Sequence, residues 1–210
     1  MNDPRILPAT LTAQSFLAIT ADEDRQLQMA HVQQQTIADQ SLEHPLIDQC
    51  LFEGTTFIND NFYRAELTDV IFKNCTLVNC QLEAASLYRV QLQNCKLVGT
   101  TFDHAVFRDV VITDCDLSLA NLNEVKFTSV KIIASRLVEV NCLDSVMIKT
   151  QLTRCDLNQA DFSGTGLKAL DLSTCDFDEL RLTANDLRGC HLNTEQAAYF
   201  AQRLLGVQLA

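Results

Sequence analysis

The sequence predicts an all-β solenoid, a four-sided parallel β-helix of about eight coils that ends in a C-terminal capping or dimerisation helix. Three observations support this fold class. Every fifth residue from Leu42 to Leu192 is apolar, over 31 consecutive positions without an insertion. A second column of small or apolar residues stands two positions before the first. Within this second column, residues twenty positions apart share their chemical character.

The period of five sets the local structure. It matches neither an α-helix, with about 3.6 residues per turn, nor a flat strand that alternates every two residues. It fits a chain wound as a coil, in which each five-residue segment makes one side. The large and the small column can both face inward, whereas the other three positions carry nearly all the charged and amide side chains.

The number of sides follows from the small column. Its lines at a spacing of twenty are Cys75, Cys95, Cys115, Ser135, Cys155 and Cys175, then Val70, Val90, Val110 and Val130, then Ala65, Ala85, Ala105, Val125 and Ser145. Because each line keeps its own character, residues twenty apart should stack, which makes four segments per coil. Successive coils would then pair as parallel strands about 4.8 Å apart.

The N-terminal part departs from this pattern. We expect residues 1–26 to form an irregular cap and residues 27–192 to form the β-helix. Within the latter, 27–41 is interpreted as an irregular first coil, and a Gln-rich helix through 26–35 is the alternative. Either would cover the upper sheet edge, which otherwise pairs with other chains.

Residues 193–210 predict a helix and tail. Asn193 or Thr194 can cap the helix, with Gln196 or Ala197 at the third helical position, and Gly206 can end it. The helix carries more apolar surface than a small cap needs, so we expect it to join two rods end to end. In the alternative, it only closes the last coil. The candidate dimer residues are Phe200, Leu204, Leu205, Val207 and Leu209.

Nine cysteines could suggest disulfides or a metal site. Eight of them occupy the small inward column, and Cys142 replaces a large inward residue, so we interpret all nine as reduced core thiols. Cys75 and Cys80 do not have the spacing of a zinc motif. The four histidines lie at unrelated positions, and no glycine-rich phosphate loop is present. We therefore predict no enzyme, no catalytic residue, no metal and no cofactor.

Composition limits the partners. The chain has 16 basic and 27 acidic residues and a net charge of −11, which argues against direct binding to nucleic acid or to an anionic membrane. From its sequence we expect no targeting or membrane-spanning segment. We therefore expect a cytoplasmic protein.

The repeat resembles that of the pentapeptide-repeat family, whose unit is roughly Ala-(Asp/Asn)-(Leu/Phe)-X-X. Clear matches are Ala120-Asn121-Leu122, Ala160-Asp161-Phe162, Cys155-Asp156-Leu157 and Cys175-Asp176-Phe177. The resemblance covers about 150 of the 210 residues. It implies a right-handed quadrilateral β-helix and, for members of this length, C-terminal dimers.

The negative charge is concentrated on two neighbouring walls of the predicted rod. The first acidic wall carries Glu83, Asp103, Glu124, Asp144 and Asp161. The second acidic wall carries Asp116, Glu139, Asp156, Asp176 and Asp178. A rod about as wide as a duplex could present these carboxylates where DNA presents phosphates, to a protein that binds DNA.

In length, repeat and C-terminal helix the chain is similar to quinolone-resistance proteins of the Qnr type. That resemblance implies a DNA mimic that binds DNA gyrase or topoisomerase IV, although the unbroken repeat lacks the loop that projects from many Qnr proteins. The alternative is an interaction rod with another protein partner. An outward apolar line through Ile58, Val78, Val98 and Val138 motivates it.

Overall fold

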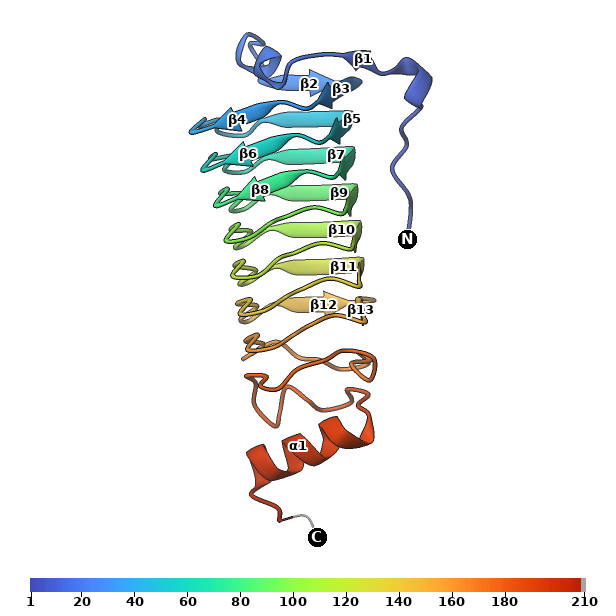
Figure 1. Cartoon of the computed structure of the whole chain (residues 1–210), viewed down its shortest axis with the longest axis vertical. Coiled ribbons are helices and arrows are strands. Elements are labelled where there is room, and N and C mark those ends of the chain that lie inside the picture. Colours follow the sequence, from blue (N-terminus) through green and yellow to red (C-terminus); the bar gives the residue numbers. More distant parts are fainter. Residues whose placement is uncertain (209–210) are drawn as a thin grey trace.

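The computed structural model describes residues 1–208, and most of this range winds as a parallel β-solenoid of about seven turns (Figure 1). One large sheet runs along the rod. Within the described residues its strands are β1 (Thr12–Ala13), β2 (Gln26–Gln28), β3 (Ala30–Gln33), β5 (Leu46–Glu53), β7 (Glu66–Lys73), β9 (Ser86–Gln93), β10 (Val106–Thr113), β11 (Lys126–Ile133), β12 (Val146–Ile148) and β13 (Gln151–Thr153). A second sheet holds β4 (Thr36–Ala38), β6 (Thr56–Ile58) and β8 (Thr76–Val78).

The strand register confirms the twenty-residue coil. Leu87 pairs with Phe107, and Phe107 pairs with Phe127, always in parallel. Beyond the two sheets, isolated bridges such as Asn61 to Gln81 continue the same offset. The fold class predicted from the sequence is therefore confirmed, with about seven turns where about eight were expected.

A third sequence position shapes each side of the coil. The residue two places after the large inward residue has a positive φ, for example 54° at Asn59 and Asn79, in an unbroken series from Met29 to Ala169. Asparagine, aspartate and glycine tolerate this left-handed conformation better than other residues. It turns the chain towards the next side, and the series stops where the last windings become less regular.

Both inward columns are buried along most of the rod, whereas Met147, Phe177, Leu187 and Leu192 near the C-terminal end are only half-buried. Large side chains such as Phe52, Phe107 and Phe127 fill the interior, and small ones such as Ala85 and Val90 face them with no exposed surface. The core is therefore one continuous stack along the rod.

The N-terminal residues close the upper end. After a short 3-10 helix, η1 (Pro8–Thr10), a second one, η2 (Phe16–Thr20), inserts Phe16 among the first phenylalanines, with its ring 5.1 Å from that of Phe57. The segment 27–41 forms β2, β3 and β4, paired in register with the next coil. The alternative of a Gln-rich helix is wrong, and this coil is more regular than expected, because Leu27, Val32 and Ile37 suffice to keep the inward column filled.

The cysteines lie where the repeat places them. Eight are buried and Cys190 is half-buried, all as free thiols. The Cys95 N–H donates to Sγ of Cys115 at 3.4 Å, and the Cys115 N–H donates to Oγ of Ser135 at 3.1 Å. These side chains thus satisfy backbone groups inside the coil. Burial raises the pKa of the Cys142 thiol to about 12, so this thiol is neutral at physiological pH.

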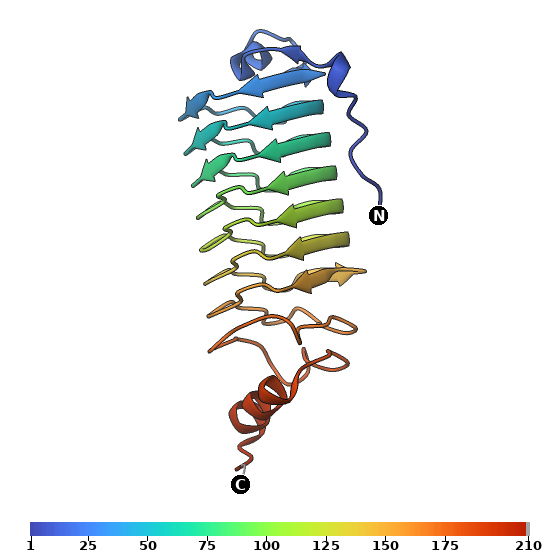
Figure 2. The ribbon, with the colours of Figure 1, turned by 45° about the vertical axis from the view of Figure 1, so that its right-hand side comes forward.

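The helix α1 (Thr194–Leu205) lies across the last coil (Figure 2). Asn193 caps it, and the Asn193 and Gln196 side chains each accept the other's backbone N–H, a capping box. Gly206 ends the helix with a φ of 66°. Among the described residues there is no helix whose length and apolar character would let it traverse a bilayer.

Candidate protein interface

The first acidic wall offers one carboxylate from each of five successive coils. Glu83 and Asp103 share one column, Glu124 and Asp144 share the next, and Asp161 continues the bridge from Asn141. Because neighbouring coils are stacked strands, these groups follow one another along the rod axis at about 4.8 Å per coil.

Several of these carboxylates are held in place by the coil itself. Asp103 Oδ1 accepts the Asn123 N–H at 2.9 Å, and Asp161 Oδ1 accepts the Ser163 N–H at 2.9 Å. Asp144 lies over Gly164, where an added Cβ would collide with Oδ1 of Asp144. Asp103 and Asp161 thus have fixed positions on the wall, whereas the exposed Glu124 lies 3.4 Å from Nδ1 of His104.

The second acidic wall is partly neutralised. Arg136 lies between Asp116 and Asp156, with N–O distances of 3.8 and 3.7 Å. Nearer the C-terminal end, Asp176 and Asp178 border a shallow hollow of about 430 Å³ together with Asp156. The unneutralised charge of this wall is thus concentrated beside the last coils.

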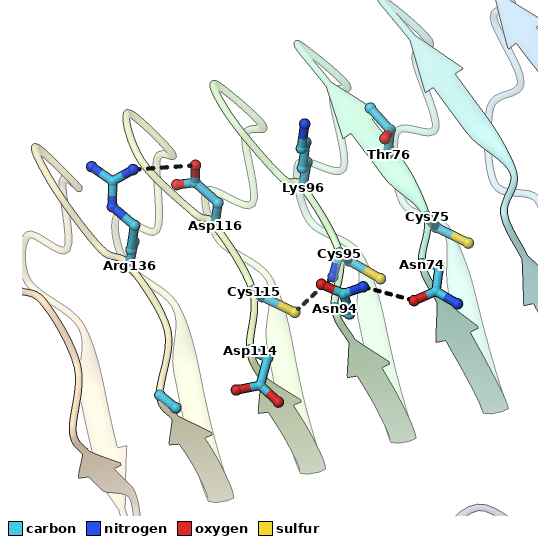
Figure 3. Close-up of a pocket in the computed structure, with 11 residues that line it drawn as sticks. Asn74, Cys75, Thr76, Asn94, Cys95, Lys96, Asp114, Cys115, Asp116 and Arg136 are labelled. Carbon is cyan, nitrogen blue, oxygen red and sulfur yellow. Dashed lines mark hydrogen bonds and ion pairs between the residues drawn. The ribbon is translucent and has the colours of Figure 1, made fainter.

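A larger open groove of about 440 Å³ lies where the second wall meets the adjoining corner (Figure 3). Figure 3 shows Lys96, Asp116 and Arg136 in one row on successive coils. The thiols of Cys95 and Cys115 are buried beneath it. Within residues 1–208, no group of three or more His, Cys, Asp or Glu side chains is placed to hold a metal. The groove offers hydrogen bonds and charge to a partner.

The outward apolar line is present but interrupted. Ile58 and Val78 are direct strand partners, and Val98 and Val138 follow in the same column with Ser118 between them. All four apolar side chains are half-buried in the isolated chain. The line is a narrow strip and not a broad apolar patch.

The structure divides the predicted dimer residues into two groups. Phe200 is only 5% exposed, and its ring lies 5.7 Å from that of Phe177. Its assignment to a dimer interface is therefore wrong, because it fastens the helix to its own rod. Leu204 packs partly against the core, whereas Leu205 and Val207 are 70% and 42% exposed. Leu209 lies outside the described residues.

Sequence reasoning missed a line of charged residues on the large sheet. Asp69, Arg89 and Asp109 occupy one column of β7, β9 and β10 and are all buried. Burial raises the pKa of Asp69, but the hydrogen bonds from Arg89 and from the backbone of Arg5 outweigh it and hold the pKa below its ordinary value. These residues repeat in position but not in residue type, so periodicity could not single them out.

Comparisons with known proteins agree with this architecture. Residues 30–122 match a family model described as the SV2A/B/C luminal domain, and residues 126–164 match one described as pentapeptide repeats. HetL, a pentapeptide-repeat protein involved in heterocyst differentiation regulation in the cyanobacterium Nostoc sp. strain PCC 7120, is similar in structure. Its TM-score is 0.57 at 21% identity, over 84% of this chain and 89% of that one.

A second similar structure is a trypsin-treated variant of QnrB1, a plasmid-mediated fluoroquinolone resistance protein. Its TM-score is 0.47 at 22% identity, over 88% of this chain and 98% of that one. A comparison with curated proteins finds no sequence match. At these identities, the structural likeness concerns the fold.

Proposed function

We propose that this chain, a pentapeptide-repeat protein, is a non-enzymatic binding protein that meets its partner through the first acidic wall. The observation that carries this proposal is the regular series of one carboxylate per coil over five coils. The rod has a packed interior and open surface grooves, which suit recognition of another macromolecule's surface better than enclosure of a small substrate.

The charge spacing favours a partner that binds DNA. The wall carries about one charge per 4.8 Å, the spacing of stacked strands. Each strand of duplex DNA carries about one charge per 3.4 Å. The wall thus reaches roughly two-thirds of the linear charge density of one DNA strand, and a basic DNA-binding surface can accept it by charge complementarity.

Within this class, we place DNA gyrase or topoisomerase IV first, on the resemblance of the repeat to Qnr-type proteins. Binding in place of DNA would then modulate quinolone sensitivity. This role requires a cytoplasmic location, which is part of the same proposal.

A gyrase supercoiling assay tests the proposal. The wild-type protein should inhibit supercoiling or protect it from a quinolone at micromolar concentration. Changing Glu83, Asp103, Glu124 and Asp144 together to lysine should weaken the effect at least about tenfold, because attraction becomes repulsion along the whole wall. A control with Glu53, Glu66, Asp171 and Glu195 changed to lysine alters the net charge equally, and these four residues lie off the columns of the first acidic wall.

Two results would contradict the proposal in different ways. No effect of the wild-type protein would refute the topoisomerase partner. An effect that survives the wall substitutions, or that the control removes equally, would refute mimicry by this wall. In that case the apolar strip through Ile58 and Val78 becomes the candidate surface of a rod with another partner.

We also propose a homodimer through the end of α1, supported by the exposure of Leu205 and Val207. In multi-angle light scattering, the wild-type protein should have the mass of a dimer. Leu205→Glu with Val207→Glu should give a monomer, because burying a carboxylate at an apolar contact is costly. Val106→Glu, at a position that is 42% exposed on the rod, is the matched control. A monomeric wild-type protein would refute the dimer.

A further inference from the structure

The first seven residues form an extended strap on the outside of the large sheet. Residues 1–7, called here the N-terminal strap, run along the rod beside the large sheet (Figures 1 and 2). They contact residues far away in the sequence, at separations of 64 and 107 positions. The strap therefore depends on the finished rod and not on its own local structure.

The strap lies over Asp69, Arg89 and Asp109, called here the charged column. The Arg5 backbone N–H donates to Asp69 Oδ1 at 2.8 Å, and the Asn2 Nδ2 donates to Asp109 Oδ2 at 2.8 Å. These contacts bracket Arg89 on the intermediate coil.

One more contact joins the strap to the intermediate coil. Gln91 Nε2 donates to Asp3 Oδ1 at 3.3 Å. The strap thus has a polar contact with each of three successive coils, through β7, β9 and β10.

The distance between the two carboxylates matches the distance between the two strap residues that bind them. Asp69 and Asp109 are two coils apart, about 9.6 Å at the strand spacing. Asn2 and Arg5 are three residues apart, about 10 Å in an extended chain. Any extended segment that runs along the rod axis can therefore place a donor opposite each carboxylate without strain.

The residues of the charged column are more deeply buried where the strap covers them. Asp69, Arg89 and Asp109 are 4%, 7% and 7% exposed. Gln49 and Ser129, in the same column above and below the strap, are only half-buried. The strap thus shields this stretch of an otherwise accessible column.

The charges of the column call for a cationic occupant. Arg89 donates to both carboxylate oxygens of Asp69, which leaves the charge of Asp109 in excess. Asn2 and the charged amino group of Met1, which lies 3.7 Å from Asp109 Oδ1, occupy that position here. A lysine or arginine in a competing segment would place a cation within hydrogen-bond distance of Asp109.

The strap is attached by polar contacts more than by buried apolar surface. Leu7 is 68% exposed and Met1 is 47% exposed. The strap also adds no strand to the sheet, because its first seven residues lie outside every strand. It can therefore leave the column while the stacked core stays intact.

We propose that the charged column is a docking site for an extended basic peptide segment of a partner protein, and that the N-terminal strap is its autoinhibitory occupant. The partner segment needs a backbone or side-chain donor for Asp69 and, three residues away, a cationic group for Asp109. The strap must leave before that segment binds.

The test uses the full-length chain and a fluorescent peptide with the sequence of residues 1–7 and the change Asn2→Lys, which supplies the cationic group for Asp109. A strap variant of the protein, Asn2→Ala with Arg5→Pro, removes both donors that bracket the column but leaves the charged column unchanged, since proline has no N–H and tolerates an extended backbone. A column variant adds Asp109→Asn to these two changes. Hydrogen exchange should show faster exchange of the remaining strap amides in both variants.

Fluorescence anisotropy then tests two points: whether the strap blocks peptide binding, and whether Asp109 contributes to it. The peptide should bind the strap variant at least about tenfold more tightly than the wild-type protein, because the strap no longer occupies the charged column. It should bind the column variant at least about tenfold more weakly than the strap variant, because a charge-assisted contact is lost. Equal binding to wild type and strap variant, binding unchanged by Asp109→Asn, or no binding to any of them would each overturn the proposal.

Discussion

Replacing Phe127 by alanine is expected to lower the free energy of unfolding by about 3–5 kcal/mol, the range for deleting a buried aromatic side chain. Phe127 is 1% exposed, and its ring lies 5.4 Å from that of Phe107 in an edge-to-face arrangement. Its strand partners are Phe107 and Met147. Parallel pairing on both sides prevents the neighbouring coils from moving in to fill the cavity.

Urea unfolding followed by circular dichroism measures this loss. Thr128→Ala, at the adjacent outward position of β11, is the matched control and should change stability by less than about 1 kcal/mol. A comparable loss in both variants would show that the inward column does not dominate the stability. Because repeat proteins couple mainly to their nearest neighbours, hydrogen exchange should locate the loosening in the coils around Phe127.

Burial explains why so much of the rod could be predicted. A parallel stack forces the same environment on every twentieth residue, so the preference for Val70, Val90 and Val110 at one corner repeats along the sequence. The acidic walls were predictable for the same reason, since residues that face outward repeat with the coil. The position with a positive φ could also have been predicted, because residues such as Asn59 and Asn79 recur there. The two inward columns alone do not indicate it.

The strap could not be predicted in this way. Its contacts with Asp69 and Asp109 are single polar interactions between distant parts of the chain, and neither the strap nor the column has a repeating residue type. Phe200 was ambiguous for a different reason. A lid over the last coil and a dimer interface both require apolar side chains, so only the position of its ring against Phe177 separates the two.

Replacing Gln196 by alanine should detach α1 from the rod. This side chain is 7% exposed, and its Nε2 donates to the carbonyl oxygens of Leu172 and Cys175, both at 2.8 Å. Its Oε1 accepts the Asn193 N–H at 3.0 Å. The substitution leaves the carbonyl oxygen of Cys175 unpaired, removes one of the two donors to that of Leu172, and breaks the capping box, for an expected loss of about 2–4 kcal/mol.

Hydrogen exchange of the α1 amides measures this detachment. Gln202→Ala is the matched control, because Gln202 is exposed on the same helix and should have little effect. Slow exchange of the α1 amides in Gln196→Ala, at the wild-type rate, would refute the anchoring role.

Gln196→Glu separates the two functions of this residue. A glutamate at this position can still accept the Asn193 N–H, but an ionised carboxylate donates to neither Leu172 nor Cys175 and brings a charge into a buried place. We expect Gln196→Glu to detach the helix as well, because the two carbonyl contacts join α1 to the coil whereas the capping box acts only within the helix terminus. If Gln196→Glu instead keeps the helix in place, the two carbonyl contacts are not needed for its attachment, and the contacts of Phe200 with Phe177 must supply it.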